Sequence, residues 1–178
     1  MVWEGRGPFN NFLTKDLFQY ADCMAVPDQQ YIEFYLKINM EDDVPLVTWN
    51  DSYSVRVREI DRQHQMLVTM INDLNDAMKQ GKGKDVLGKI VSGLTSYTAT
   101  HFKTEEKYFD RFKYPDADSH KKEHTAFVKK VSDFKKGFEE GKLMLTVDVM
   151  NFLSDWLLKH IKGADKKYSQ LFVDNGLQ

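Results

Sequence analysis

The sequence has a single cysteine and four prolines in 178 residues, and it contains no long uncharged hydrophobic run. One cysteine, Cys23, cannot form an internal disulfide, which favours a reducing compartment. The missing hydrophobic run excludes a predicted membrane span and an export signal. A formal net charge of −2 without a basic block argues against nucleic acid as a partner. We therefore expect a cytoplasmic protein.

The distribution of hydrophobic residues predicts one domain with an N-terminal extension. Hydrophobic residues make up 42% of the chain, which is enough for one core but hardly for two. Helical periodicity is strong after Pro45 and absent before it, so we assign residues 45–178 to the domain and residues 1–44 to the extension. Three interpretations of the extension stay open: a mostly disordered leader, a docking segment for a partner or second subunit, and a true translation start at Met40. Alternation over residues 32–39 favours one short strand there.

The domain is expected to be an all-α, antiparallel up-down-up-down four-helix bundle preceded by an extended N-terminal arm. The run PLVTWNDSYSV mixes turn formers with aromatic and β-branched residues, which is typical of such an arm. Four amphipathic patterns follow: from near Ile60 to Gly81, over residues 84–112, from after Pro115 to Gly141 with Phe138 facing inward, and from Thr146 as N-cap to the polar tail. Short loops make neighbouring helices antiparallel.

All five histidines and two carboxylates occupy inward positions of these helices, at His64, His101, Glu105, His120, His124, His160 and Asp165. In an up-down bundle, residues early in the first and third helices meet residues late in the second and fourth. All seven side chains should therefore converge at one end of the bundle. Burying them without partners would cost several kcal/mol, a cost that metal ions would remove.

Seven nitrogen and oxygen donors are too many for one ion, so the sequence predicts two ions. If both ions are six-coordinate, these donors and one bridging oxygen leave a single position open. Iron is the natural candidate, because an open position on ions with neighbouring oxidation states is where dioxygen can bind.

Asp165 departs from simple periodicity, because it follows His160 by five residues. Five steps of a regular α-helix turn a side chain about 140° away from the first one. We therefore predict a local widening such as a π-bulge near Gly163, where a glycine backbone tolerates distortion.

Four runs carry a resemblance to a known family: VTWNDSYSVRVREIDRQHQML, HFKTEEKYF, HKKEH and WLLKHIKGADKKY. They are similar in order and spacing to the His, HxxxE, HxxxH and HxxxxD signatures of the hemerythrins, specifically the single-domain bacterial ones. The resemblance implies two iron ions (Fe2+/Fe3+) with a bridging oxo or hydroxo group. It implies that His120, His124 and His160 hold one iron, that His64 and His101 hold the other, and that Glu105 and Asp165 bridge both.

The resemblance also implies a function. In this family dioxygen binds reversibly at the two-histidine iron, and Leu67, Phe102, Trp156 and Ile161 resemble the pocket around it. We expect an oxygen carrier, store or delivery protein, a monomer or weak homo-oligomer, with an oxidase as the partner that receives oxygen. The two anionic ligands contrast with the carboxylate-rich di-iron oxidases, which favours binding over catalysis. A sensing module that signals through a partner, and a weak enzyme that consumes peroxide or nitric oxide, are the alternatives.

Overall fold

The computed structural model describes residues 44–142 and 144–178 and shows four helical rods without any strand in those ranges. Three rods are single helices, α3 (Arg58–Lys79), α4 (Gly83–Phe112) and α5 (Ala117–Glu139). The fourth consists of α6 (Leu145–Trp156), the π-helix η2 (Leu157–Ala164) and α7 (Asp165–Asp174) in direct succession. The predicted all-α fold is confirmed. The strand expected at residues 32–39, Cys23 and Met40 lie outside the described residues.

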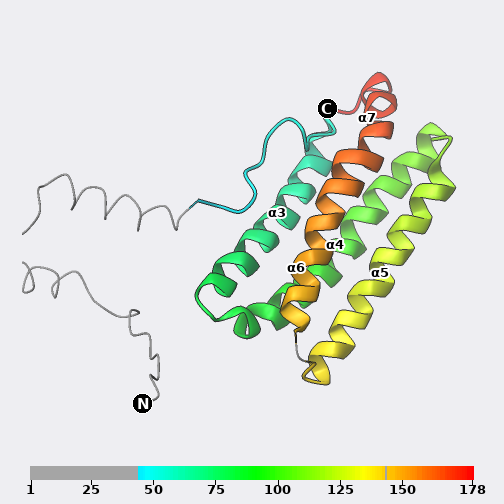
Figure 1. Cartoon of the computed structure of the whole chain (residues 1–178). Helices are drawn as coiled ribbons and strands as arrows, with labels where there is room; N and C mark the ends of the chain where they lie inside the picture. The colour runs from blue at the N-terminus through cyan, green and yellow to red at the C-terminus, as the bar shows by residue number, and fades with distance from the viewer. Residues whose placement is uncertain (1–43, 143) are drawn as a thin grey trace, which may run out of the picture. The chain divides into compact units, whose positions relative to one another are not determined.

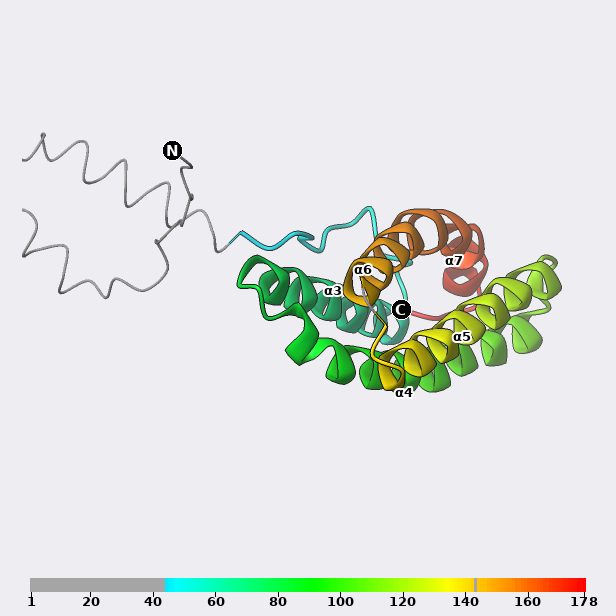
Figure 2. The same cartoon turned by 60° about the horizontal axis from the view of Figure 1, so that its bottom comes forward.

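The rods run alternately down and up and form an antiparallel bundle (Figure 1). Helix α4 packs between α3 and α5, and α6 closes the bundle against both of these helices. Figure 2 shows the fourth rod lying across the bundle from α4. The start of α3, the end of α4, the start of α5 and the end of the fourth rod therefore meet at one end of the bundle. Across residues 44–142 and 144–178, no helix is long and apolar enough to span a membrane.

The turns explain where the rods end. Gly81 and Gly141 follow α3 and α5 with φ angles of 70° and 66°, the left-handed backbone that glycine adopts without strain. Both were predicted to end these helices. The prediction of Thr146 as an N-cap was wrong, because the fourth rod already begins at Leu145. Leu145 is 3% exposed and packs over Gly137 of α5, so the buried Leu145 side chain is part of the helix and the N-cap is Met144, two residues before Thr146.

Two apolar clusters fill the bundle, one on each side of the level where the seven donor side chains lie. Along α3, His64 lies between Ile60 of the smaller cluster and Leu67 of the larger one. Apolar clusters therefore enclose the donors on both sides along the bundle axis. The expected burial of Phe138 was wrong: its side chain is 43% exposed, because its ring lies over Gly88 on the edge of α4.

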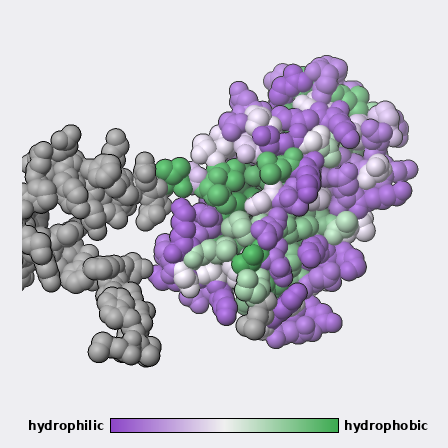
Figure 3. Space-filling model, in the orientation of Figure 1, coloured by the Kyte–Doolittle hydropathy of each residue, from purple (hydrophilic) through white to green (hydrophobic). Residues whose placement is uncertain are grey.

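The segment before α3 forms the expected arm, since residues 45–57 contain no helix or strand. Its backbone at Val47 makes two hydrogen bonds of 2.9 Å with the Asn72 side chain of α3. Val47, Trp49 and Tyr53 pack against the larger apolar cluster. Figure 3 shows hydrophobic residues gathered where the beginning of this arm meets the helices, with further hydrophobic residues between hydrophilic ones along the middle of the same face. The Trp49 ring of the arm lies 6.4 Å from the ring of the donor His64, between ring centroids, so the arm covers the bundle beside this donor.

Candidate metal centre

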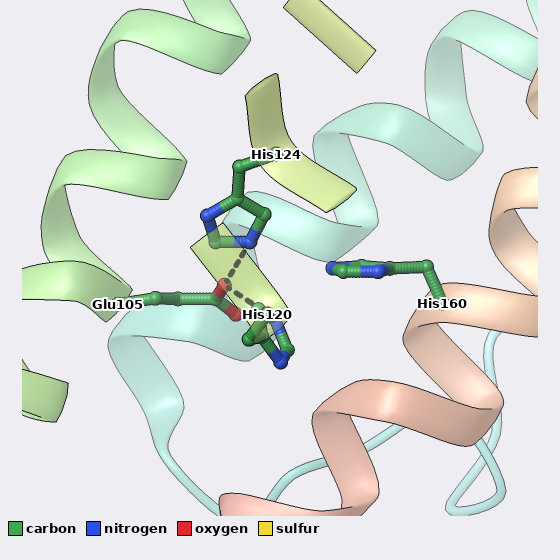
Figure 4. Close-up of side chains that lie close together, drawn as sticks. All are labelled: Glu105, His120, His124 and His160. Atoms are coloured by element: carbon green, nitrogen blue, oxygen red, sulfur yellow. Dashed lines mark ion pairs between the residues drawn. The ribbon is translucent and has the colours of Figure 1, made fainter. Parts of the chain in front are cut away.

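All seven predicted donor side chains are buried, and the structure brings them together. The most exposed of them, His120, is only 3% exposed. They form two groups that share one carboxylate: Glu105, His120, His124 and His160 in the first group, and His64, His101, Glu105 and Asp165 in the second. Figure 4 shows how the first group converges from α4, α5 and the fourth rod. Within each group the donor atoms lie within 4.8 Å of one another.

The two carboxylates lie between the groups, and each directs one oxygen to either side. The Oδ1 atom of Asp165 is 3.1 Å from Nε2 of both His120 and His160, whereas its Oδ2 atom is 3.2 Å from Nε2 of His64. The Oε2 atom of Glu105 is 3.0 Å from Nε2 of His124, and its Oε1 atom is 3.6 Å from Nε2 of His101. This is the arrangement expected of carboxylates that bridge two ions.

The polar atoms that face the centre lie close to one another, but they make no well-oriented hydrogen bonds among the described residues. The Nε2 atoms of all five histidines are buried without such a hydrogen bond, as are Oε2 of Glu105 and both oxygens of Asp165. Each buried polar atom without a hydrogen bond costs about 1–3 kcal/mol, so a cluster of such atoms indicates a compensating ligand. Metal ions fit this donor set, because they would satisfy imidazole nitrogens and carboxylate oxygens at the same time.

The π-helix η2 brings the side chains of His160 and Asp165 to the same side of the rod, although these residues are five positions apart. The backbone N–H of Asp165 donates a hydrogen bond to the carbonyl of His160, a five-residue step in place of the four-residue step of an α-helix. Both side chains consequently point into the bundle, with exposed fractions of 1% and 0%. The predicted widening is confirmed. Gly163 has no left-handed φ angle, so the widening does not depend on the conformational freedom of glycine.

Aromatic rings line three of the histidines. Phe102 stacks on His124 with a centroid distance of 3.9 Å, and Trp156 stacks on His160 at 3.8 Å. Tyr97 stacks on His101 at 4.7 Å. Of the four residues expected in a dioxygen pocket, Phe102 and Trp156 therefore cover histidines of the first group. The other two, Leu67 and Ile161, are fully buried in the larger apolar cluster.

The pKa values show how the protein balances these charges when no metal is bound. Burial lowers the pKa of His101 to about 3 despite the nearby Glu105 carboxylate, so this imidazole stays neutral. Burial also acts to lower the pKa of His120, but the adjacent Asp165 and Glu105 carboxylates raise it to about 9. Burial acts to raise the pKa of both carboxyls, whereas the surrounding histidines hold it below the usual range. A protonated His120 thus offsets part of the buried negative charge.

The sequence did not predict the residues that form hydrogen bonds with the Nδ1 atoms of the histidines, on the side of each ring that faces away from the centre. Gln63, Glu106 and Glu123 contact the Nδ1 atoms of His101, His124 and His160, at 3.0, 2.9 and 2.6 Å. Tyr168 donates a hydrogen bond to Glu105. Gln63, Glu106 and Glu123 each adjoin a donor in the sequence, a signal that could have drawn attention to them. Each is hydrogen-bonded to a histidine on the next rod, however, and this pairing is visible only in the folded bundle.

The fold and the donor set together define a class: four-helix bundles with buried histidine and carboxylate groups that can hold metal. Residues 55–172 match the family model described as the hemerythrin HHE cation binding domain. The chain belongs to this hemerythrin family, which confirms the resemblance seen in its motifs.

Individual relatives agree with this membership. The bacteriohemerythrin of Pseudomonas aeruginosa is 34% identical over 122 residues, which cover 68% of this chain and 78% of that protein. The bacteriohemerythrin of Methylococcus capsulatus is 34% identical over 69% of this chain and 94% of that protein. A crystal structure of wild-type hemerythrin superimposes with a TM-score of 0.64 at 33% identity, and covers 71% of this chain and 97% of that one.

Proposed function

We propose that this protein binds dioxygen reversibly at a pair of non-haem iron ions, as an oxygen carrier, store or delivery protein and not as an enzyme. The observation that carries the proposal is the division of the Glu105 and Asp165 oxygens between two groups of histidines. Membership of the hemerythrin family supports iron as the metal and dioxygen as its ligand. Delivery of oxygen to an oxidase is the partner relationship that this function implies.

The assignment of the donors follows from the two groups. His120, His124 and His160 would hold one iron, and His64 and His101 the other, with Glu105 and Asp165 bridging both together with an oxo or hydroxo group. When bound, an iron pair would supply the redox chemistry that reversible dioxygen binding needs. The two-histidine position has fewer protein donors, so it would be the position open to an external ligand.

The remaining side chains exclude water and larger molecules. Leu67 and Ile161 are fully buried, and Phe102 is 4% exposed, so these apolar side chains separate the donors from bulk water on their side of the centre. A deeply buried donor set enclosed by apolar side chains favours reversible binding of a small gas over turnover of an organic substrate. We assign the dioxygen pocket to Leu67, Phe102, Trp156 and Ile161.

Metal analysis combined with optical spectra taken under argon, then air, then argon again tests the function. We expect two irons per chain and a colour change on exposure to air that reverses when oxygen is removed. The variant His101→Ala should hold less iron and lose the reversible change, whereas Glu139→Gln, on the exposed surface of α5, should behave as the wild type. Zinc alone in the purified protein, or irreversible bleaching in air, would overturn the proposal.

A further inference from the structure

The hydrogen bonds behind the histidines follow a regular order around the bundle. Gln63 of α3 is hydrogen-bonded to His101 of α4, Glu106 of α4 to His124 of α5, and Glu123 of α5 to His160 of the fourth rod. The fourth rod provides no such partner for His64 of α3. The Nδ1 atom of His64 on α3 is buried and has no hydrogen-bond partner in the part of the chain that the structure describes.

The charge of these partners differs between the two histidine groups. In the three-histidine group, two imidazoles face carboxylates, at Glu106 and Glu123. In the two-histidine group, His101 faces the neutral amide of Gln63. That amide is held in place because its Nε2 atom lies 3.3 Å from the Thr104 hydroxyl, to which it donates a hydrogen bond, leaving Oε1 toward the imidazole. The Nδ1 atom of the second imidazole of this group, His64, has no hydrogen-bond partner among the described residues.

Both glutamates lie at the edge of the bundle, partly in contact with solvent. The Glu106 side chain is 35% exposed and the Glu123 side chain 47% exposed, although the histidines they contact are buried. Glu106 also lines a surface groove of about 670 Å³ between α4 and α5, whose lining includes Phe102 and His124. The carboxylates therefore remain hydrated on one side and accept a hydrogen bond on the other, without the penalty of full burial.

A carboxylate that accepts the Nδ1–H of an imidazole fixes the ring orientation and makes the opposite nitrogen a stronger donor to a metal ion. A neutral amide does this less, and an unpaired nitrogen does not do it at all. We infer that Glu106 and Glu123 make the three-histidine position the tight metal position, which fills first, while the two-histidine position is the weaker and more exchangeable one. The inference rests on the proposed two-ion site.

Titration of the metal-free protein with Co2+ under argon, against a chelator of known affinity, tests this inference without any measurement of oxygen binding. We expect the wild type to bind two Co2+ ions in two separate steps. Glu106→Gln and Glu123→Gln should each weaken the first step by about 10- to 100-fold and change the second step far less. Glu123→Asp should restore part of the lost affinity. Gln63→Glu should tighten the second step and bring the two affinities closer together.

Glu139→Gln provides the matched control, because this exposed glutamate of α5 lies far along the helix from the donors and should leave both steps unchanged. Circular dichroism of each metal-free variant shows whether it is folded before titration. Two-step binding that is indifferent to Glu106→Gln and Glu123→Gln would overturn the inference and leave the two-ion site intact. Binding of fewer than two Co2+ ions by the wild type would instead overturn the two-ion site itself.

Discussion

The buried carboxylates Glu105 and Asp165 destabilise the metal-free protein, whereas the same carboxylates would favour the binding of metal ions. Both carboxylates are fully buried, and one oxygen of Glu105 and both oxygens of Asp165 have no hydrogen-bond partner among the described residues. Neighbouring histidines offset their charge by holding protons, and metal ions would take the place of those protons. Burial of these carboxylates therefore lowers the stability of the metal-free folded state, and metal binding would remove this destabilisation. The size of the destabilisation should depend on pH.

The metal-free protein should lose stability as pH rises from about 6.5 to about 9. The pKa of His120 is raised from 6.5 to about 9 in the folded state, so its contribution is complete below 6.5 and disappears as pH passes 9. A shift of this size corresponds to a free energy of unfolding on the order of 3 kcal/mol. Urea denaturation of metal-free protein at several pH values measures it. Metal-free His120→Asn should show a smaller decrease, with the remainder due to His160, whose pKa the Asp165 carboxylate also raises despite burial. A wild-type stability that is flat or rising across the same interval would contradict the assignment.

The fourth rod shows how a helix can depart from regular geometry in order to place two side chains. In η2 the hydrogen bond from Asp165 to His160 spans five residues, where a regular α-helix spans four. His160 and Asp165 therefore lie on the same side of the rod, and both side chains point inward. The departure accompanies the burial of both donors, and α7 after it contacts the arm through the hydrogen bond from the Ser169 hydroxyl to the carbonyl of Val55. Gly163 lies within this segment, but the structure does not use its conformational freedom.

Gly163→Ala should therefore leave metal binding intact and stabilise the protein. A methyl group at this position would meet no described atom within 4 Å, and alanine is favoured over glycine in helices by about 1 kcal/mol. Chemical denaturation and metal analysis of the variant check both parts. Gly88→Ala offers the contrast, because its Cβ would lie 2.8 Å from the Phe138 ring and force that ring to move. Loss of metal in Gly163→Ala would show that the π-turns do require glycine.

The complete bundle joins four rods through a single layer of donors between two apolar clusters. Every rod contributes at least one donor, at His64 of α3, Glu105 of α4, His120 of α5 and His160 of the fourth rod. Metal ions bound there would cross-link the entire fold, because the unfolded chain does not hold these side chains together. Folding and metal binding should therefore be thermodynamically linked.

Removal of the metal should lower the melting temperature substantially. Free metal at about 1,000 times its Kd stabilises the folded state by about 4 kcal/mol, which corresponds to a shift on the order of 10 °C for a domain of this size. Thermal melts of loaded, stripped and reloaded protein measure the effect, and reloading should restore the original value. Equal melting temperatures for the stripped and loaded protein would exclude the linkage.

The sequence by itself determined the number of rods, their approximate ends, the seven donors at one end of the bundle and the widening between His160 and Asp165. These features follow from periodicity, which records how each side chain is oriented about its own helix axis. Only the tertiary structure decided which carboxylate oxygen faces which histidine group, that Glu106 and Glu123 hold imidazoles on neighbouring rods, and that Phe138 lies at the surface. The reason is that such contacts depend on the rotation and axial offset of one rod against another, which packing of the whole core sets.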